Sequence, residues 1–556
     1  MRPYCNRMRW SDSHLVLPSD CGGEELISRF LSFRGFSVGA DQENFLRPRL
    51  ASLAAPEELP GISDGVEFLS EAIQAKKRIL IFSDYDVDGI VSATLMKLFL
   101  RSQGAGEIQT FMPDRQKEGY GLTMGALDRA LDQGFIPEVF LALDCGTNSF
   151  HEVEKLKKAG IRVLIVDHHQ LSDPQPKADV MVNPQRGSVG HHFCTAGLVF
   201  KLCHAYQRAK GSREKFDLRD IMDLVALATV ADLVPLLNDN RIFVQEGLRR
   251  LAKTVHPGLK RLMEVSGVGQ RVPTSFTLGF QLGPRINAGG RVGDASSGLE
   301  LLLSHDPTET ARLARELDLQ NRRRQELEAV ALGEAEEQVE SLPKGLANVV
   351  ASDRWHPGVV GIVAARLVRK FHRPSFTIAL NSEGEGRGSG RGLPGLSLMD
   401  ALRACSSCLK GFGGHDAAAG IVIEAGQVAE FRKLLQAWLE THVAPDIFEK
   451  TLPIDIQLCP SHLTPEMARS LAELAPFGKG NPEPTLRVDG VQVVGTPRIF
   501  AERHLKFRAQ AGDKKFEVIG FDFAKRVPTQ KVFDLAGIWE WDDYTDGPRW
   551  RMTDWQ

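Results

Sequence analysis

Residues 78–89 read RILIFSDYDVDG, a short apolar run that stops at a cluster of acidic side chains. The same pattern returns at VFLAL (139–143) and RVLIV (162–166), each followed at once by acidic or histidine residues. Short continuous apolar runs of this kind are typical of buried parallel strands. Their alternation with helical patterns predicts an α/β domain built on a doubly wound parallel sheet, in which ligands bind at the carboxyl ends of the strands.

Three aspartates alternate directly after the first run, at Asp84, Asp86 and Asp88. Carboxylates this close repel one another, and the repulsion raises their pKa values. A divalent cation removes the conflict, because carboxylate oxygens are hard ligands that suit Mg²⁺ or Mn²⁺. Calcium loops also use the pattern D-x-D-x-D-G, but they place a glutamate at the twelfth position, where this chain has Leu95. The residues after Gly89 predict a helix instead, which favours a catalytic metal.

Further candidate ligands follow the other two strands. Asp144 ends the second strand, Asp167-His168-His169 ends the third, and Asp232 ends the helical run DLVALATVAD. Alone, an aspartate at a strand end is often only a turn former. Here the clusters end successive strands, so we expect them to converge at one edge of the sheet. Mixed carboxylate and imidazole ligands favour Mn²⁺ over a site made of oxygen alone.

The stretches DYDVDG (84–89), DCG (144–146), DHH (167–169) and TVAD (229–232), in this order, resemble the four motifs of the DHH phosphoesterase superfamily. The resemblance implies two Mn²⁺ or Mg²⁺ ions that activate a water molecule for attack on phosphorus, with Asp144 bridging the ions and His169 facing the substrate phosphate. The implied metal ligands are Asp84, Asp86, Asp88, Asp144, His168 and Asp232. The implied catalytic residues are Asp86, Asp88, Asp144, His168, His169 and Asp232.

Two stretches, PDRQKEGYGL (113–122) and GPRINAGGR (283–291), resemble motifs of the RecJ branch of this superfamily. Three others, WHPGVVG (355–361), GSGR (388–391) and GGH (413–415), resemble the DHH-associated domain, whose glycine-rich loops hold the substrate strand. We therefore expect loops at the last two stretches and a phosphate-binding helix N-terminus at the first. The implied substrate-binding residues are Arg285, Asn287, Arg291, His356, Ser389, Arg391, Gly413, Gly414 and His415. The run 387–394 departs from the family pattern in its tail, which leaves its contacts open.

Helix and turn signals set the domain organisation. Asp306 is a predicted N-cap and Pro307 the first helical residue of a helix that runs to position 341, a spacer between two domains. After it come a second α/β segment, a helix at about 464–474 and a small β-barrel. PFGKGNPEP (476–484) and HLKF (504–507) resemble the oligonucleotide-binding (OB) barrel of RecJ proteins. The predicted domains are an N-terminal segment of open role (1–65), the DHH catalytic domain (66–305), the connecting helix (306–344), the smaller DHH-associated substrate-binding domain (345–445) and an OB-type barrel that binds nucleic acid (446–556).

The bulk composition is that of an ordinary soluble multidomain protein. The 556 residues exceed what one hydrophobic core holds. The net charge is −3, so if this chain acts on nucleic acid, its positive charge must be concentrated in one groove. The pair Cys405 and Cys408 could suggest zinc, but no second pair lies at finger spacing, so we expect helix core there. The scattered cysteines favour a reducing cytoplasm, and no apolar run approaches the ~20 residues that span a bilayer.

The resemblance implies a metal-dependent exonuclease that hydrolyses single-stranded DNA from its 5′ end to 5′-mononucleotides, in DNA recombination and repair. It also implies a single-strand-binding protein and a helicase as partners; we expect a monomer and no membrane. Two alternatives stay open. A DHH-family phosphodiesterase acting on short oligonucleotides or cyclic dinucleotides usually ends after the second domain, so the added barrel favours a polymer substrate. A non-catalytic single-strand-binding replication factor would lack metal ligands, and here the set is complete.

Overall fold

Five parallel strands form the sheet that carries the acidic clusters. The computed structural model describes residues 8–11, 14–115, 117–187, 192–269, 272–542 and 545–556. The strand order across the sheet is β4 (Ile108–Phe111), β3 (Ile79–Ser83), β5 (Val139–Leu143), β6 (Arg162–Val166) and β7 (Val180–Val182), with every neighbouring pair parallel. The chain changes direction across the sheet at β3, so β3 and β5 flank the topological switch point where such folds bind ligands. The predicted doubly wound sheet is confirmed.

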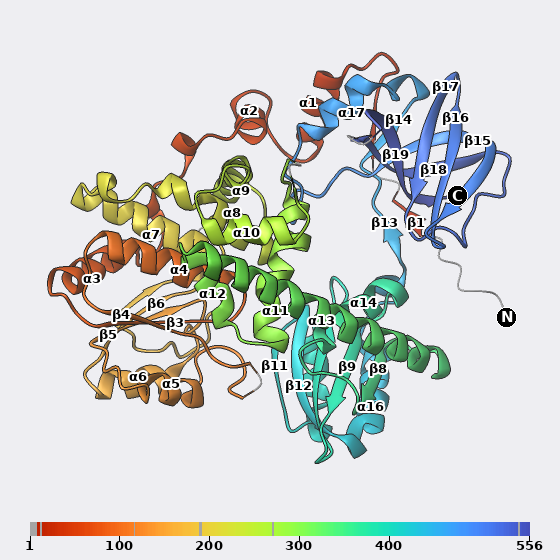
Figure 1. Ribbon diagram of the computed structural model, residues 1–556. Helices are drawn as coiled ribbons and strands as arrows, with labels where there is room; N and C mark the ends of the chain where they lie inside the picture. The colour runs from red at the N-terminus through yellow and green to blue at the C-terminus, as the bar shows by residue number, and fades with distance from the viewer. Residues whose placement is uncertain (1–7, 12–13, 116, 188–191, 270–271, 543–544) are drawn as a thin grey trace.

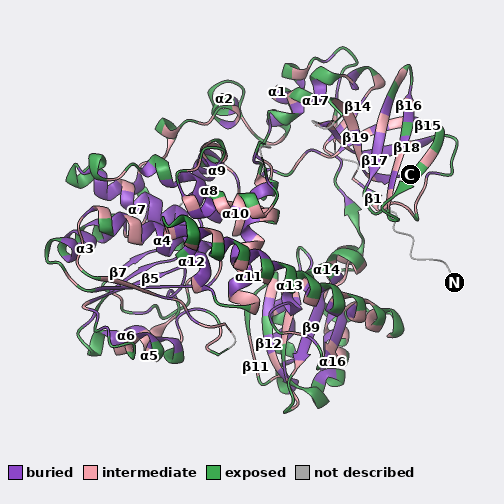
Figure 2. Ribbon diagram, viewed as in Figure 1, coloured by how far each residue is buried: buried purple, intermediate pink, exposed green. Residues whose placement is uncertain are grey.

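Helices cover both faces of this sheet (Figure 1). One face carries α3 (Ile62–Gln74), α4 (Val87–Ser102) and α7 (Thr195–Lys210), and the other carries α5 (Met124–Leu131) and α6 (Phe150–Lys158). Side chains of a strand alternate between the faces, so Ile79 and Ile81 join one apolar core while Leu80 and Phe82 join the other. The strands are buried along their length (Figure 2), which explains why they read as continuous apolar runs.

A helical layer links this sheet to the second domain. It comprises α8 (Met222–Ala231), α9 (Asn238–Leu251), α10 (Pro257–Val265), a π-helical turn at Thr277–Leu282, α11 (Gly283–Val292), α12 (Ser296–Leu303) and the long α13 (Pro307–Ser341). The side chain of Asp306 caps α13 by accepting the amide hydrogens of Thr308 and Glu309, at 2.7 and 3.0 Å. Leu313 and Leu317 of α13 pack in the catalytic core, whereas Ala331 and Ala335 pack in the second domain. The predicted spacer helix is therefore confirmed.

The second domain is a mixed five-stranded sheet. Its strand order is β11 (Gly411–His415), β12 (Ala418–Glu424), β10 (Glu385–Arg391), β9 (Ser375–Leu380) and β8 (Asn348–Ser352), packed with α14 (Val360–Phe371), α15 (Leu398–Ala404) and α16 (Val428–His442). Cys405 and Cys408 follow α15 and are buried in the apolar core, in agreement with the expected core position.

The expectation of glycine-rich loops at 388–391 and 413–415 is wrong, because both stretches lie in strands, β10 and β11. A Cβ atom on Gly390 would lie 2.3 Å from the ring of Phe376, and one on Gly388 would lie 2.7 Å from Ile421. These glycines face a core already filled from the neighbouring strands. Because successive strand residues alternate between faces, Ser389 and Arg391 both lie on the opposite face.

The C-terminal domain is a closed five-stranded barrel. Its strands pair in the cycle β15 (Leu486–Phe500), β16 (His504–Ala511), β17 (Lys514–Gly520), β19 (Gly547–Trp555) and β18 (Phe533–Asp542), and β18 returns to β15. β14 (Ile456–Leu458) adds to β15, and α17 (Pro465–Ala472) packs on the barrel. The predicted barrel and the helix before it are confirmed.

The N-terminal segment is built into this barrel domain, although more than 400 residues separate them. β1 (Arg9–Trp10) pairs with β13 (Thr451–Leu452), and β2 (Leu15–Val16) pairs with β14. α1 (Gly23–Phe33) contributes Leu26 and Phe30 to the barrel's apolar core, and α2 (Ala40–Leu46) follows it toward the catalytic domain (Figure 1). Within the described ranges, no helix combines the length and apolar character needed to cross a membrane.

Candidate metal centre

The carboxyl ends of β3, β5 and β6 and the C-terminal end of α8 bring together the candidate metal ligands from all four motifs. Three overlapping groups of side chains offer ligand atoms that lie within 4.8 Å of one another. The groups are Asp84, Asp86 and Asp144; Asp144, His168 and His169; and Asp88, His168 and Asp232. Asp144 and His168 each belong to two groups, so the site is one connected cluster rather than separate acidic patches.

The loop after β3 is held by main-chain hydrogen bonds. Asp86 caps α4 by accepting the amide hydrogens of Asp88 and Gly89 on Oδ1, at 2.9 and 3.1 Å. Gly89 must be glycine, because a Cβ there would lie 2.2 Å from the carbonyl oxygen of Asp84. The chain continues as α4, in which Leu95 is fully buried. The calcium-loop alternative therefore fails, since its twelfth position is part of the core.

The N-terminus of α7 holds the carboxylates of Asp88 and Asp144 by hydrogen bonds. The amide groups of Thr195 and Ala196 donate to the two oxygens of Asp88, at 2.6 and 2.8 Å. The Thr195 hydroxyl donates to Oδ1 of Asp144 at 3.0 Å. Asp144 has a left-handed backbone with a φ of 62°, a strained conformation that non-glycine residues keep mainly at functional sites. Both carboxylates are thereby fixed in orientation before any ligand binds.

The third motif is organised by Asp167. Its carboxylate accepts the amide hydrogens of His168 and Thr147, at 2.8 and 3.1 Å, and lies 2.6 Å from Nδ1 of His169. On the other edge of the same ring, Nε2 of His169 lies 2.7 Å from the Tyr120 hydroxyl. Burial opposes charge on His169, but the Asp167 carboxylate outweighs burial and raises the pKa of His169 to about 9. His168 turns Nε2 toward Asp144 and Asp232 instead, at 3.4 and 3.7 Å.

Not every carboxylate oxygen of the cluster has a partner within the protein, which tests whether the site suits cations. Within the described part of the chain, Oδ2 of Asp232 is buried without a hydrogen-bond partner. Burial and the neighbouring carboxylates raise the pKa of Asp84 and Asp144, and they raise the pKa of Asp232 to about 9. A buried anion without a partner is unfavourable by several kcal/mol. Divalent cations bound among these oxygens would supply the missing partners.

A second group of candidate residues forms a basic cluster next to the first loop. The Arg115 guanidinium lies 5.6 Å from the ring centre of Tyr85, and Nη1 of Arg291 donates to the carbonyl of Gly358 at 3.3 Å. Arg391 donates to the Ser389 hydroxyl at 2.8 Å, and both side chains lie against Gly361 at the start of α14. Burial, and the positive charge of Arg115, lower the pKa of Arg291 to about 10 and also lower the pKa of Arg391. An anion bound beside these partly buried guanidinium groups would stabilise their charge, so the cluster suits a phosphate.

The remaining predicted substrate-binding residues have different surroundings. Arg285 donates to Asp318 of α13 at 2.9 Å and to the carbonyl of Gln281 at 2.6 Å. Asn287 accepts the Val87 amide hydrogen at 2.9 Å and so supports the start of α4. His356 accepts the Gly358 amide hydrogen on Nδ1 at 3.0 Å. Gly413, Gly414 and His415 are exposed on β11, the edge strand nearest the catalytic domain (Figure 1).

The structure also shows contacts of residues that are not in the predicted set of site residues. Tyr120 and Thr195 contact His169 and Asp144, as described above. Phe276 and Phe280 stack on each other with ring centres 4.9 Å apart and planes 21° apart, although they are 60% and 67% exposed. Their spacing of four residues is a recognisable helical signal, but only the fold shows that no described element covers the two rings.

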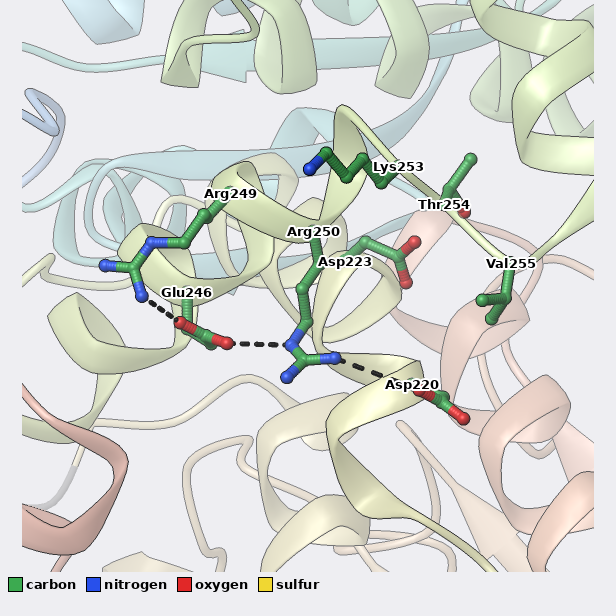
Figure 3. Close-up of a pocket in the computed structure, with 8 residues that line it drawn as sticks. All are labelled: Asp220, Asp223, Glu246, Arg249, Arg250, Lys253, Thr254 and Val255. Carbon is green, nitrogen blue, oxygen red and sulfur yellow. Dashed lines mark hydrogen bonds and ion pairs between the residues drawn. The ribbon is translucent and has the colours of Figure 1, made fainter.

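A hollow lies away from the metal cluster, at the opposite end of α8 (Figure 3). This cavity, of about 330 Å³, lies beside Asp220 and Asp223, whereas Asp232 follows the last residue of α8. Figure 3 shows Glu246 between Arg249 and Arg250, with ion pairs at 2.8 and 2.7 Å. The charges that line the cavity thus neutralise one another, which makes it a poor site for an anionic substrate.

Family models and similar proteins agree on the family to which this chain is related. A model of the DHH family N-terminal domain matches residues 78–229, one of the DHHA1 domain matches 343–441, and one of the RecJ OB domain matches 454–552. The chain is 37% identical to the single-stranded-DNA-specific exonuclease RecJ of Dickeya dadantii, over 86% of either chain. It is 33% identical to the Bacillus subtilis RecJ over 93% of this chain, but spans only 66% of that longer protein.

A solved structure extends the likeness to the whole architecture. RecJ from Thermus thermophilus in complex with Mn²⁺ superposes with a TM-score of 0.83 at 29% identity, covering 99% of this chain and 80% of that one. The same protein has been solved in complex with Mg²⁺.

Proposed function

This chain belongs to the family of RecJ single-stranded-DNA-specific exonucleases, and from that membership we propose that it hydrolyses single-stranded DNA from the 5′ end to 5′-mononucleotides. The observation that carries the proposal is the convergence of the candidate ligands Asp84, Asp86, Asp88, Asp144, His168 and Asp232 at the switch point of the sheet. An acidic cluster of this kind suits phosphodiester hydrolysis.

The donor set fits two divalent cations, Mn²⁺ or Mg²⁺. Asp84, Asp86 and Asp144 would hold one ion, Asp88, His168 and Asp232 the other, and Asp144 lies beside both groups. When bound, such a pair of ions polarises the scissile phosphate and lowers the pKa of a water molecule so that it attacks phosphorus. The amide hydrogen bonds to the carboxylates of Asp86 and Asp88 keep these donors in position, as outer partners of metal ligands do elsewhere.

We assign to His169 the electrostatic stabilisation of the scissile phosphate. Its ring is fixed on both edges, by Asp167 and by Tyr120, so its charge keeps one position beside the metal cluster. Asp167 also keeps His169 in the protonated form near neutral pH, because it raises the pKa of the ring. A fixed cation beside the cluster would stabilise negative charge on the phosphate oxygens as the bond to the leaving oxygen breaks.

We assign the terminal 5′-phosphate to the basic cluster of Arg115, Arg291, Ser389 and Arg391. These side chains come from both facing domains, and Ser389 and Arg391 lie at the N-terminus of α14. Guanidinium groups match phosphate oxygens with paired donors, and a helix N-terminus adds further attraction. Holding the terminal phosphate here would place the first phosphodiester bond over the metal cluster and so set the direction of degradation. We propose that His356 and the exposed residues 413–415 also contact the strand, whereas Arg285 joins α11 to α13 and Asn287 supports the start of α4.

The stacked pair Phe276 and Phe280 supports a nucleobase-bearing strand as the substrate. The pair lies on the π-helical turn whose Gly279 packs against Val230, two residues before Asp232. Exposed aromatic side chains stack on bases without regard to their identity. A small phosphorylated metabolite would not need such a platform or the C-terminal barrel, so a polymer is favoured over short oligonucleotides and cyclic dinucleotides.

We extend the proposal to the cellular role. Degradation of single strands fits DNA repair and recombination, where a helicase would supply the strand and a single-strand-binding protein would cover it. A DNA substrate and the unpaired cysteines of the described chain suit the cytoplasm. We propose that the protein acts as a monomer, because each candidate residue comes from one chain.

The direct test is a nuclease assay on single strands labelled at the 5′ or the 3′ end, with Mn²⁺ or with chelator. We expect the 5′ label to appear at once in mononucleotides, while the 3′ label stays in a shortening strand, and no degradation with chelator. A blunt duplex of the same sequence is the matched substrate. Degradation from the 3′ end, or equal rates on duplex and single strand, would overturn the proposal.

A further inference from the structure

The motif PFGKGNPEP lies against the catalytic domain and not on the open surface of the barrel. The amide of Leu236 donates to the carbonyl of Lys479 at 2.7 Å, and the Ser275 hydroxyl donates to the carbonyl of Phe477 at 2.6 Å. A Cβ on Gly478 would lie 2.7 Å from Leu236, and one on Gly480 would lie 2.9 Å from Pro235. These contacts hold the segment between α17 and β15 beside the turn that follows Asp232, where it reaches across to the catalytic domain (Figure 1).

Arg241 reinforces the docking. Its guanidinium is buried and donates to the carbonyls of Leu474 and Ala475, at 3.1 and 2.7 Å, and it lies 3.7 Å from the ring centre of Phe45. Asn481 closes the same loop by donating to the carbonyls of Leu474 and Pro476, both at 2.9 Å. The main chain around Lys479 is therefore fixed at both ends, and its side chain projects from a rigid base.

Lys479 carries its charge beside the turn that follows Asp232. Its carbonyl accepts the amide hydrogen of Leu236, its side chain is exposed, and among the described residues it has no ion-pair partner. The basic cluster of Arg115 and Arg291 lies beside Tyr85 and Asp86, the other side of the site. The acidic centre thus has cations on two sides, one set from the first two domains and one from the C-terminal region.

We propose that Lys479 is a substrate-positioning residue, which binds the backbone phosphate on the 3′ side of the scissile bond. This inference rests on the proposed function and deepens it. Two divalent ions would neutralise most of the charge of the aspartates, so the substrate would be the remaining anion within reach of Lys479. The terminal phosphate would lie in the basic cluster and the scissile phosphate at the metal cluster. The phosphate after the scissile one would then extend past Asp232, on the side where Lys479 lies. Lysine suits this contact, because it binds phosphate as a point charge without fixed geometry.

The assignment gives the C-terminal region a direct part in the reaction. The barrel and the catalytic domain are joined through residues 474–481, so the position of the barrel sets the position of the Lys479 ammonium. A strand long enough to reach Lys479 would gain this contact, whereas a dinucleotide, which has no further phosphate on that side, would not. The contact therefore discriminates between substrates by length.

The test compares Lys479→Gln and Lys479→Arg with Lys531→Gln, a substitution of another exposed lysine in the C-terminal domain. Steady-state kinetics are measured on a 5′-phosphorylated single strand and on a 5′-phosphorylated dinucleotide, over a range of salt. For Lys479→Gln we expect KM for the strand to rise roughly tenfold, since a charged hydrogen bond contributes about 1.5 kcal/mol or more. We also expect the slope of log kcat/KM against log salt to become shallower by about 0.7, the loss of one phosphate contact.

Three controls separate the possible explanations. Lys479→Arg keeps the charge and should restore the slope, Lys531→Gln should match the parent, and dinucleotide cleavage should not change in any variant. A thermal midpoint equal to the parent's shows that Lys479→Gln is folded. If the parent degrades the strand but Lys479→Gln has the KM and salt slope of the parent, the assignment of Lys479 fails and the proposed function stands. If the parent leaves the strand intact, the proposed function fails and the inference with it.

Discussion

The hydroxyl of Tyr120 lies 2.7 Å from Nε2 of His169, on the opposite edge of the ring from Asp167. Tyr120 comes from the loop after β4, which is held by the ion pair between Glu118 and Arg129. His169 comes from the loop after β6. Two loops from different strands therefore fix one imidazole, and Tyr120 is the contact that the four-motif pattern does not contain.

We expect removal of the contact between Tyr120 and His169 to lower kcat without lowering the stability of the protein. Tyr120→Phe keeps the ring, which is half-exposed, but loses the hydroxyl that holds Nε2 of His169. We expect kcat to fall about tenfold, since a hydrogen bond to a charged group contributes about 1.5–3 kcal/mol. Tyr206→Phe, in the core beside Phe99, is the matched control and should keep its kcat. Full activity of Tyr120→Phe would show that Asp167 alone orients the ring.

We expect Asp144→Ala to abolish hydrolysis and to leave the binding of single strands intact. Asp144 lies in two of the three ligand groups, so its removal should affect both ions. We expect kcat to fall by more than the roughly 100-fold that loss of an outer partner costs, while the affinity for single strands, measured by fluorescence anisotropy, changes little. Asp132→Ala, at the exposed end of α5, is the control. Turnover at the parent rate in Asp144→Ala would remove the two-ion assignment.

Local signals in the sequence were sufficient to predict the strands and the spacer helix. VFLAL and RVLIV are β5 and β6 with the predicted bounds, because each strand is buried on both faces and each ends at a turn. Asp306 and Pro307 begin α13 where the N-cap and first-turn preferences place it. Convergence of Asp144 and His168 followed from one rule, that parallel strands end at the same edge of a sheet.

Other features depend on partners far away in the chain. Gly388 and Gly390 predict a loop, since the sequence does not show that Phe376 and Ile421 fill the space where their side chains would lie. β2 has only two residues, too few for a periodic pattern, and it pairs with β14 across the whole chain. Lys479 lies in a motif that resembles the OB barrel of RecJ proteins, so its position beside the turn that follows Asp232 could come only from the fold.

The metal-free protein should lose stability as pH rises. The pKa of Asp232 is raised to about 9 in the folded state, against about 3.9 for an unfolded aspartate, so the folded protein holds a proton that the unfolded chain releases between these values. The free energy of unfolding then falls as pH increases up to about 9. Bound cations replace the proton and remove this dependence.

Thermal unfolding checks this prediction with the same protein in Mn²⁺ and in chelator. We expect the gain in Tm from Mn²⁺ to grow from pH 6 to pH 8.5, by at least about 2 °C, the shift that ~1 kcal/mol produces in a large domain. The difference between the two conditions cancels other titrating groups. A gain in Tm that stays constant or shrinks over this range would show that the cluster does not bind the ions in exchange for protons.

Truncation of the stacked phenylalanines should weaken binding of single strands. In Phe276→Ala/Phe280→Ala the apolar platform is lost, and each stacked base contributes about 1–3 kcal/mol. We expect KM for a long strand to rise at least about tenfold and kcat to stay the same, because neither ring belongs to the groups of candidate metal ligands. Phe33→Ala, an exposed phenylalanine on α1, is the matched control. An unchanged KM would mean that the strand takes another route to the metal cluster.

Loss of the Arg241 guanidinium should separate the C-terminal domain from the catalytic domain. Arg241 is buried, has main-chain carbonyls from two distant segments as its acceptors and stacks on Phe45. Arg241→Met keeps the apolar stem but leaves carbonyls buried without donors, a loss of roughly 1–3 kcal/mol each. We expect the thermal midpoint to fall and cleavage of long strands to fall more than cleavage of dinucleotides, since Lys479 depends on this docking. Arg249→Met, which removes an exposed guanidinium from the same helix, should change neither. Equal losses on both substrates would show that Arg241 stabilises the catalytic domain itself and not its junction with the barrel.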